Sequence, residues 1–283
     1  MSGTLLVARH ALQEALRRRV LLVVGVLTLV FGLLYVWGCD ELFQDVSGFA
    51  ENDSDLPARE LAGATILGLA IFGTLFLGVV LSVFLTVGAI RGDAERGLLQ
   101  PIVVRPLGRP PYLLGRFLAA ASVSAAYVVA VYLGAVLVTG VVGDWWPEHP
   151  FAVALRLALA AVVVAALSLL GSVFLGATAN GILMLMAYGA GLLAGLLGAI
   201  GDVIPSRTLE RIADVTSWAL PFEALYRDAL RLLVQDVQGP GAVVLLGPLG
   251  GSFDAGPLML PWAVVYVAAV LLAAALAFAR RDL

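Results

Sequence analysis

Side chains able to perform chemistry are scarce in this sequence, and their scarcity excludes several classes of function. All 17 basic residues are arginine. A P-loop needs a lysine to reach the β- and γ-phosphates of a nucleotide, so this chain cannot build an ATPase site of that type. Cys39 is the single cysteine, which excludes an intrachain disulfide and a cysteine metal cluster. The two histidines, His10 and His149, fall at opposite ends of the topology derived below, so we predict no metal site and no catalytic residue.

One charged stretch interrupts the apolar sequence at residues 91–116, which read RGDAERGLLQPIVVRPLGRPPYLLGR. Asp93 can cap a short helix that carries Glu95 in its first turn and is stopped by Pro101. Such a helix is too short to be stable alone, so tertiary contacts must hold it. Prolines then stiffen the return of the chain. The stretch is either a compact projection that fits a pocket on another protein or a loop over the protein's own helix ends. Physical reasoning leaves both open.

The elements around this stretch are those of a membrane protein. Hydrophobic residues make up 61% of the 283 residues and charged residues 13%, against roughly half and a quarter in soluble domains. A helix needs about 20 apolar residues to cross a bilayer. The sequence therefore predicts a single, all-α polytopic domain, 1–283, with six transmembrane helices. The predicted spans are 20–38, 61–90, 117–142, 151–178, 181–201 and 261–279.

Arginine placement sets the predicted orientation, because cytoplasmic segments of membrane proteins carry an excess of basic residues. With the N-terminus inside, the inner segments hold 11 of the 17 arginines and four of the 20 acidic residues. The opposite orientation would place this basic excess outside. We therefore predict that both termini lie in the cytoplasm.

The segments between and before the spans are predicted to form further elements. Residues 1–19 combine an apolar and a charged face, which is typical of an amphipathic helix at the inner membrane surface. In the outer segment 202–260, two amphipathic helices are predicted to cap the bundle or to lie on its surface, with Glu223 and Arg227 paired on the polar side. The acidic segment 39–60 is interpreted as a solvated loop.

Two features lie within the spans. Arg156 is close enough to the outer end of the fourth span to reach the lipid headgroups. The spans lack the buried carboxylates and histidines that proton-driven carriers need. The fifth span repeats a small residue every four positions, which lets another helix approach closely. This ridge is either a special interface or ordinary bundle packing. Its members are Ala187, Gly191, Gly195 and Ala199.

The charged stretch also resembles a known family. Its run ERGLLQPIVVRPLGR and the return LLGRFL are similar to the hairpin of permease subunits of type-2 ABC exporters. That hairpin has an acidic-Arg-Gly-Thr/Leu-Leu run, an Arg-Pro pair, and a Gly-basic pair that opens the third span. The order of elements along the chain, the outer LPFEALY and the final FARRDL agree with it. The branch that includes the nitrous-oxide-reductase maturation permease is the most similar.

The resemblance implies that the hairpin 91–116 is a coupling helix seated in a separate ATPase subunit. Two permeases would work with two ATPases, so the partners are an ABC ATPase and a second copy or a related permease in the bilayer. ATP and Mg²⁺ would bind the partner subunit, while this chain would bind no cofactor and catalyse no reaction, which fits the absence of lysine. The ATPase-coupling candidates are Asp93, Glu95, Arg96, Leu98, Leu99, Arg105 and Arg109.

By the same resemblance, the second and fifth spans line a cavity at the dimer seam, and the outer helices would gate the exit path unless they are plain surface helices. Lining candidates, each also compatible with ordinary packing, are Phe72, Thr74, Phe76, Met184 and Tyr188. The expected function is ATP-driven export across the cytoplasmic membrane of a prokaryote, and the apolar spans favour a hydrophobic or amphipathic substrate. The alternative is an ATPase-independent carrier or scaffold. Nothing in the sequence indicates nucleic-acid binding.

Overall fold

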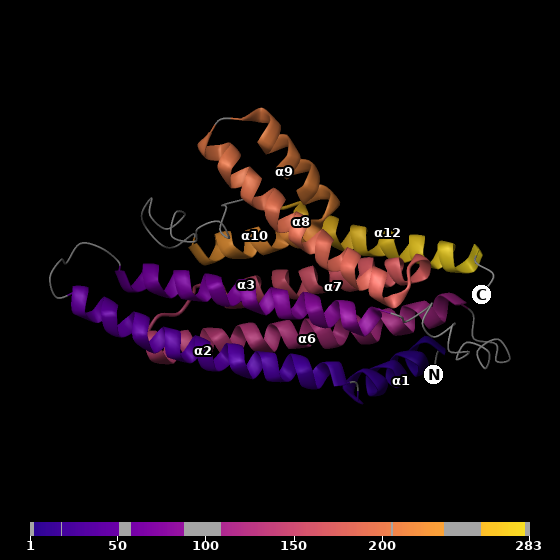
Figure 1. Cartoon of the computed structure of the whole chain (residues 1–283), viewed down its shortest axis with the longest axis horizontal. Coiled ribbons are helices and arrows are strands. Elements are labelled where there is room, and N and C mark those ends of the chain that lie inside the picture. The colour runs from indigo at the N-terminus through magenta and orange to yellow at the C-terminus, as the bar shows by residue number, and fades with distance from the viewer. Residues whose placement is uncertain are drawn as a thin grey trace.

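The computed structural model describes residues 3–17, 19–50, 58–87, 109–204, 206–234 and 256–280. Within these residues all regular structure is helical (Figure 1). The helices are α1 (Gly3–Arg17), α2 (Arg19–Ala50), α3 (Ala58–Thr86), α6 (Arg109–Gly143), α7 (Pro150–Phe174), α8 (Ala177–Val203), α9 (Arg207–Ala219), α10 (Pro221–Val234) and α12 (Met259–Arg280).

Six of these helices are long and apolar enough to cross a membrane, which confirms the predicted all-α architecture with six spans. They are α2, α3, α6, α7, α8 and α12. Both ends of the chain lie at the same end of the molecule, as an even number of spans requires (Figure 1). Following the predicted orientation, we call this the inner end and the opposite one the outer end.

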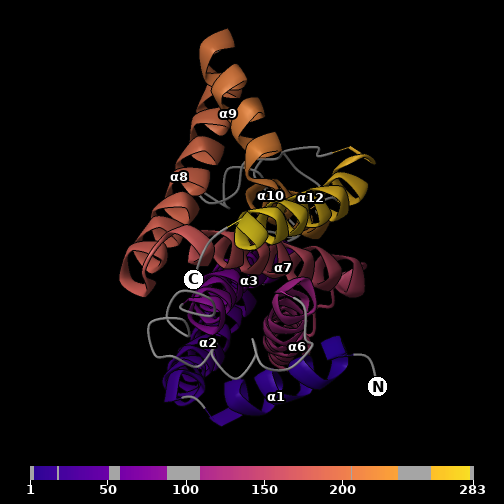
Figure 2. The same cartoon turned by 90° about the vertical axis from the view of Figure 1, so that its right-hand side faces the viewer.

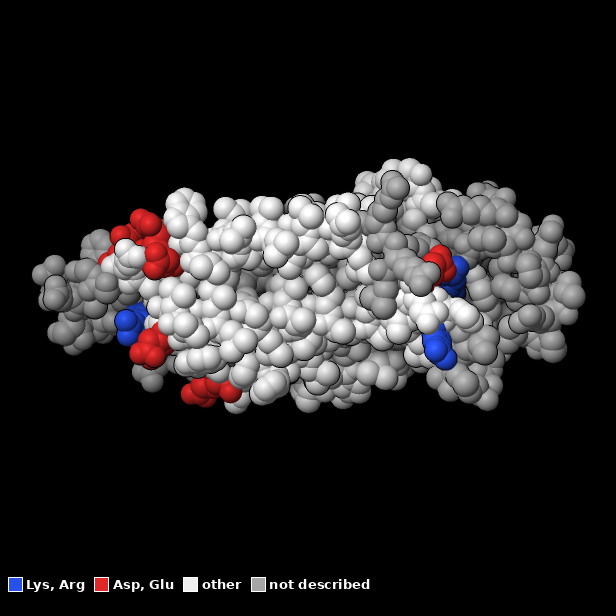
Figure 3. All heavy atoms as spheres, turned by 90° about the horizontal axis from the view of Figure 1, so that it is seen from below, with Lys and Arg blue, Asp and Glu red and all other residues white. Residues whose placement is uncertain are grey.

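The surface of the molecule fits a membrane location. On the face shown in Figure 3, charged side chains lie near the two ends and a broad uncharged band separates them. Exposed leucines of α2, such as Leu22, Leu29 and Leu33, are 69–72% exposed. In a bilayer these side chains would contact lipid, where a helix satisfies its own backbone groups.

Helix α7 is the centre of the bundle. It packs against α3, α6, α10 and α12, and its buried residues extend from Val153 to Val173. The buried face of α7 is rich in small residues such as Ala160, Ala161 and Ala165, which let neighbouring helices approach closely. Helix α7 therefore contributes to two hydrophobic clusters, one around Val153–Val164 and one around Ala165–Val173.

Two helices extend beyond their predicted spans at the outer end. Helix α2 continues to Ala50 and α3 begins at Ala58, so the interpretation of 39–60 as a loop is wrong for most of that segment. The physical reason is tertiary packing. The ring of Phe43 occupies the space that a Cβ on Gly143 would take, and Cys39 is fully buried. These contacts prolong α2 past its apolar run.

Helix α6 begins earlier than predicted, at Arg109. Pro110 and Pro111 were expected to stiffen an irregular return, but they form the first turn of this helix. Proline is tolerated there because the first backbone N–H groups of a helix have no intrahelical acceptor. The start of α6 is held by burial of Tyr112 and Leu113.

The N-terminal helix α1 lies across the start of α6 (Figure 2). The Val7 side chain fills the space in which Gly115 lacks a Cβ. Arg116 Nη1 donates a hydrogen bond to Glu14 Oε2 at 2.8 Å. One side of α1, which carries Val7 and Glu14, therefore packs on the start of α6.

Helices α8 and α9 project from the bundle as an antiparallel pair (Figures 1 and 2). Helix α10 follows α9 directly but packs along the outer part of α7. All residues from Pro221 to Leu230 are buried. The outer segment thus contains the two predicted helices, which differ sharply in their surroundings.

Candidate functional site

Aromatic side chains from three helices meet where α8 approaches the bundle. Tyr188 of α8 contacts Phe76 of α3 and Phe222 of α10, with ring centroids 6.2 and 6.0 Å away. Phe72, one turn before Phe76, meets Tyr226 of α10 at a centroid distance of 6.5 Å. We call these five residues the aromatic junction. It brings the second and fifth spans together and adds α10, which the sequence did not place there.

The other two predicted cavity residues lie outside the aromatic junction. Thr74 is fully buried and lies on the opposite side of α3 from Phe72 and Phe76, because a step of two residues turns a helix by about 200°. Met184, one turn before Tyr188, is half-buried against the core. In the junction itself Phe76 is 42% exposed while Tyr188 is 4% exposed. A role in lining a cavity stays a prediction for all of them.

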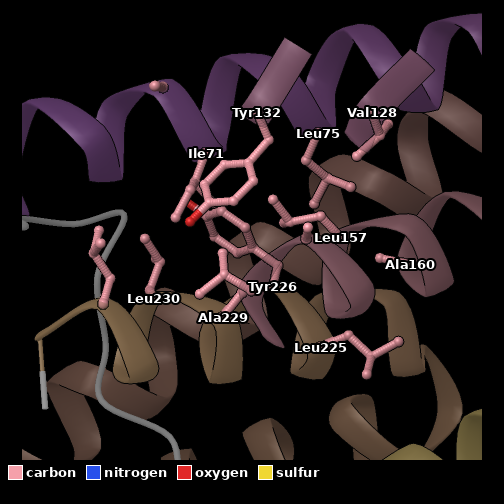
Figure 4. Packing of buried hydrophobic residues seen from close by; sticks show 14 of the residues in the cluster. Ile71, Leu75, Val128, Tyr132, Leu157, Ala160, Leu225, Tyr226, Ala229 and Leu230 are labelled. Carbon is pink, nitrogen blue, oxygen red and sulfur yellow. The ribbon is translucent and has the colours of Figure 1, made fainter. Parts of the chain in front are cut away.

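The core beside the junction contains buried hydroxyl groups. Figure 4 shows the rings of Tyr132 and Tyr226 next to each other, close to Ile71 and Leu157. Among the described residues, the hydroxyls of Tyr132 and Tyr188 have no hydrogen-bond partner. Burying a hydroxyl without a partner costs free energy, so these two groups do not stabilise the core through hydrogen bonds.

A first group of charges connects α10 to α7. Arg156 Nε lies 2.5 Å from Asp228 Oδ2, and Arg231 Nη2 lies 3.2 Å from Asp228 Oδ1. We call these three residues the α7-side cluster. The side chains of Arg156 and Asp228 are only 15% and 5% exposed. Removing one member of a buried ion pair costs about 3–5 kcal/mol, so the cluster holds α10 in the bundle.

A second group of charges connects α10 to α9. Arg227 Nε lies 2.5 Å from Glu223 Oε1, and Arg227 Nη2 donates to Ser217 Oγ of α9 at 2.8 Å. We call these three residues the α8-side cluster, because it faces α8. Burial raises the pKa of the Glu223 carboxyl to about 7, while the guanidinium of Arg227 acts in the opposite direction. Glu223 and Arg227 therefore form a buried ion pair, in which the guanidinium favours the charged form of the carboxyl group.

The small-residue ridge of α8 receives the α8-side cluster. A Cβ on Gly195 would collide with the Glu223 carboxylate, and a Cβ on Gly191 would lie 3.3 Å from Glu223 Cβ. Ala187 is half-buried, and the side chain of Ala199 lies outside the described residues. The two glycines thus leave room for charged side chains of the same chain.

Helix α12 caps the end of α9. The indole N–H of Trp262 donates to the carbonyl of Trp218 at 3.1 Å, and the Tyr266 hydroxyl donates to the carbonyl of Ala219 at 2.8 Å. The last carbonyls of a helix have no intrahelical partner and must find one when water is excluded. The two aromatic donors satisfy this need, so α9 can end against the bundle.

The two charge clusters correct two sequence-based interpretations. Arg156 pairs with Asp228 of α10, a partner that the sequence did not indicate. Glu223 and Arg227 lie in the interior and not on a solvated side. The spans themselves lack carboxylates as predicted, and the buried ones belong to α10. A signal was present, since an arginine within an apolar span needs a partner, but nothing local points across the 72 residues between Arg156 and Asp228.

Most of the predicted coupling residues lie outside the described residues. These are Asp93, Glu95, Arg96, Leu98, Leu99 and Arg105. Arg109 is the first residue of α6, and its side chain is likewise not described. At the end of the hairpin, the ion pair between Arg116 and Glu14 connects the start of α6 to α1.

The fold and these sites define a helical membrane protein with six spans and two further helices, α9 and α10, before the last span. Residues 5–283 match the family described as ABC-2 family transporter protein, and the chain belongs to that family. It is thus a permease subunit of an ABC transporter. The comparison with curated proteins finds no match to this chain.

Proposed function

We propose that this permease exports a hydrophobic or amphipathic substrate from the cytoplasm, driven by ATP hydrolysis on a separate subunit. Its membership in the ABC-2 family over nearly the whole chain carries this proposal. The absence of lysine supports it, since a P-loop ATPase must then be another chain that holds ATP and Mg²⁺. The hairpin motifs favour the branch of the nitrous-oxide-reductase maturation permease and the cytoplasmic membrane of a prokaryote.

The working unit in this proposal is a pair of permeases with a pair of ATPases. A second copy, or a related permease, would cover the exposed apolar face of α8, which includes Ile182, Met186 and Leu193 at 56%, 68% and 63% exposure. The substrate would pass between the two copies, next to the partly exposed Phe76 of the aromatic junction. An apolar substrate suits this surface, because the spans there carry no charge.

Coupling to the ATPase is assigned to the hairpin 91–116. Its return continues directly into α6, and the start of α6 is bound to α1 by Arg116 and Glu14. A push on the hairpin would therefore reach α6 and α1 together. Glu95 and Arg96, in the segment before Pro101, are the proposed contacts with the ATPase.

Purification of the chain in mild detergent, from cells that express its native gene neighbourhood, tests this function. We expect an ATPase subunit to co-purify in equal amounts and to hydrolyse ATP. Glu95→Arg should abolish co-purification or uncouple hydrolysis, whereas Glu148→Arg, an exposed charge reversal at the outer end, should leave both unchanged. If no ATPase is found, the chain is a gradient-driven carrier or a scaffold instead.

A further inference from the structure

Helix α1 lies across the inner ends of the spans. Figure 2 looks at this end of the molecule, and there α2 and α6 are seen nearly end-on while α1 crosses below them. Helix α1 packs mainly against α6, and its Val7 side chain contacts Gly115 close to the start of that helix. In the predicted orientation, a helix at right angles to the spans in this position lies at the level of the cytoplasmic lipid headgroups.

Two opposite sides of α1 differ in exposure. Val7 fills the space above Gly115, and Ala11, one turn later, is buried. Arg9 and Gln13 each follow one of these residues by two positions, a step that turns a helix by about 200°. Both are exposed. The side of α1 that α6 does not cover therefore presents polar and basic groups.

The segment that contains α1 has an excess of positive charge. Residues 1–19 contain a single acid, Glu14, whose carboxylate lies 2.8 Å from Arg116 of α6 and is thus engaged by a base from outside the segment. On the face in Figure 3, acidic side chains gather mostly at the outer end of the molecule. A basic segment at a membrane surface attracts anionic lipids. The arginines of this segment are Arg9, Arg17, Arg18 and Arg19.

An apolar side chain stands beside the exposed arginine of α1. Leu12 follows Arg9 by three residues, so the two are neighbours on the helix surface, and Leu12 is only half-buried. Such a pair can hold a guanidinium among the headgroups while the leucine and the arginine methylenes contact acyl chains. A soluble anion would use the charge alone, whereas a phospholipid uses both parts.

We propose that the exposed side of α1 binds anionic phospholipids of the cytoplasmic leaflet. Arg9 contacts the phosphate, Leu12 contacts the acyl chains, and the other arginines of residues 1–19 add to the attraction. A ligand that binds one arrangement of a protein stabilises that arrangement. Anionic lipid therefore holds α1 in its place over the start of α6, where Glu14 and Arg116 pair.

Native mass spectrometry of the full chain in detergent, titrated with phosphatidylglycerol or phosphatidylcholine, tests this proposal. We expect the first anionic lipid to bind at least about tenfold more tightly than the neutral one. Arg9→Gln combined with Arg17→Gln should remove most of this preference. The matched control, Arg207→Gln combined with Arg211→Gln, removes two exposed arginines of α9 and should keep it.

Three results of this titration would overturn the proposal. The first is the absence of a preference in the unmodified chain, and the second is an equal preference in the two double variants. The third is displacement of the lipid by inorganic phosphate, because the site would then recognise a free anion.

A second measurement locates the lipid without removing an arginine. Bimane labels at Gln13→Cys on α1 and Glu148→Cys before α7, both exposed, are compared in a Cys39→Ala background. In nanodiscs that contain both lipids, brominated phosphatidylglycerol should quench the label at position 13 more strongly than brominated phosphatidylcholine. The label at position 148 should not show this excess. Equal quenching by the two lipids at position 13 overturns the proposal. Both measurements use the chain without ATPase or substrate, so they are independent of the proposed function.

Discussion

Helices α9 and α10 are neighbours of similar length and similar amphipathic pattern, yet they occupy different environments. Helix α9 exposes Arg207, Arg211 and Asp214. Helix α10 buries Glu223, Arg227 and Asp228 and leaves Arg231 half-buried. The two charged faces are alike in the sequence and opposite in the structure.

This difference shows that an amphipathic pattern identifies the apolar face of a helix. It does not predict whether the polar side chains are buried or exposed to solvent. Helix α10 can be buried because every one of its charges meets an opposite charge, one of them from α7. The charges of α9 remain at the surface, where water compensates them. Partners elsewhere in the chain, and not the helix itself, decide which case applies.

Replacing an aspartate should reveal the largest difference in stability between the two helices. We expect Asp228→Ala to destabilise the protein by about 3–5 kcal/mol, because Arg156 and Arg231 would lose the carboxylate between them. Asp214→Ala, the matched change on α9, should have little effect, since Asp214 is exposed. Thermal unfolding of the purified chain in detergent measures both. Equal destabilisation by the two changes would contradict the contrast.

A smaller effect should come from the cap at the end of α9. Tyr266→Phe deletes only the hydroxyl that donates to the Ala219 carbonyl, and we expect a loss of about 1 kcal/mol. Tyr132→Phe is the control, since among the described residues the Tyr132 hydroxyl has no hydrogen-bond partner to lose. It should leave stability unchanged or increase it. Urea titration of the two variants decides the matter, and a larger loss in Tyr132→Phe would refute the role of the cap.

The smallest effect should come from the exposed arginines. Arg211→Gln is expected to change stability by less than about 0.5 kcal/mol, because its side chain is solvated in the folded and unfolded states. Calorimetry in the same detergent tests this. A loss comparable to that of Asp228→Ala would mean that α9 is held by its charges as α10 is.

The sequence predicted the architecture well and the site only in part. Apolar run length predicts each of the six spans, because a bilayer imposes it on every helix separately. Two amphipathic helices were predicted in the outer segment, and α9 and α10 are found there. The partner of Arg156 was not predicted, since pairing between distant helices leaves no periodic signal. The ends of α2 and α6 were misplaced because Phe43 and Tyr112 extend them by tertiary packing.

The aromatic cap on α9 has a consequence for how the protein is made. Trp262 and Tyr266 belong to the last helix, which leaves the ribosome after α8, α9 and α10. Until that helix is made, the carbonyls of Trp218 and Ala219 lack the two donors that α12 supplies. The contact that caps α9 can therefore form only after the segment that contains α12 has been synthesised.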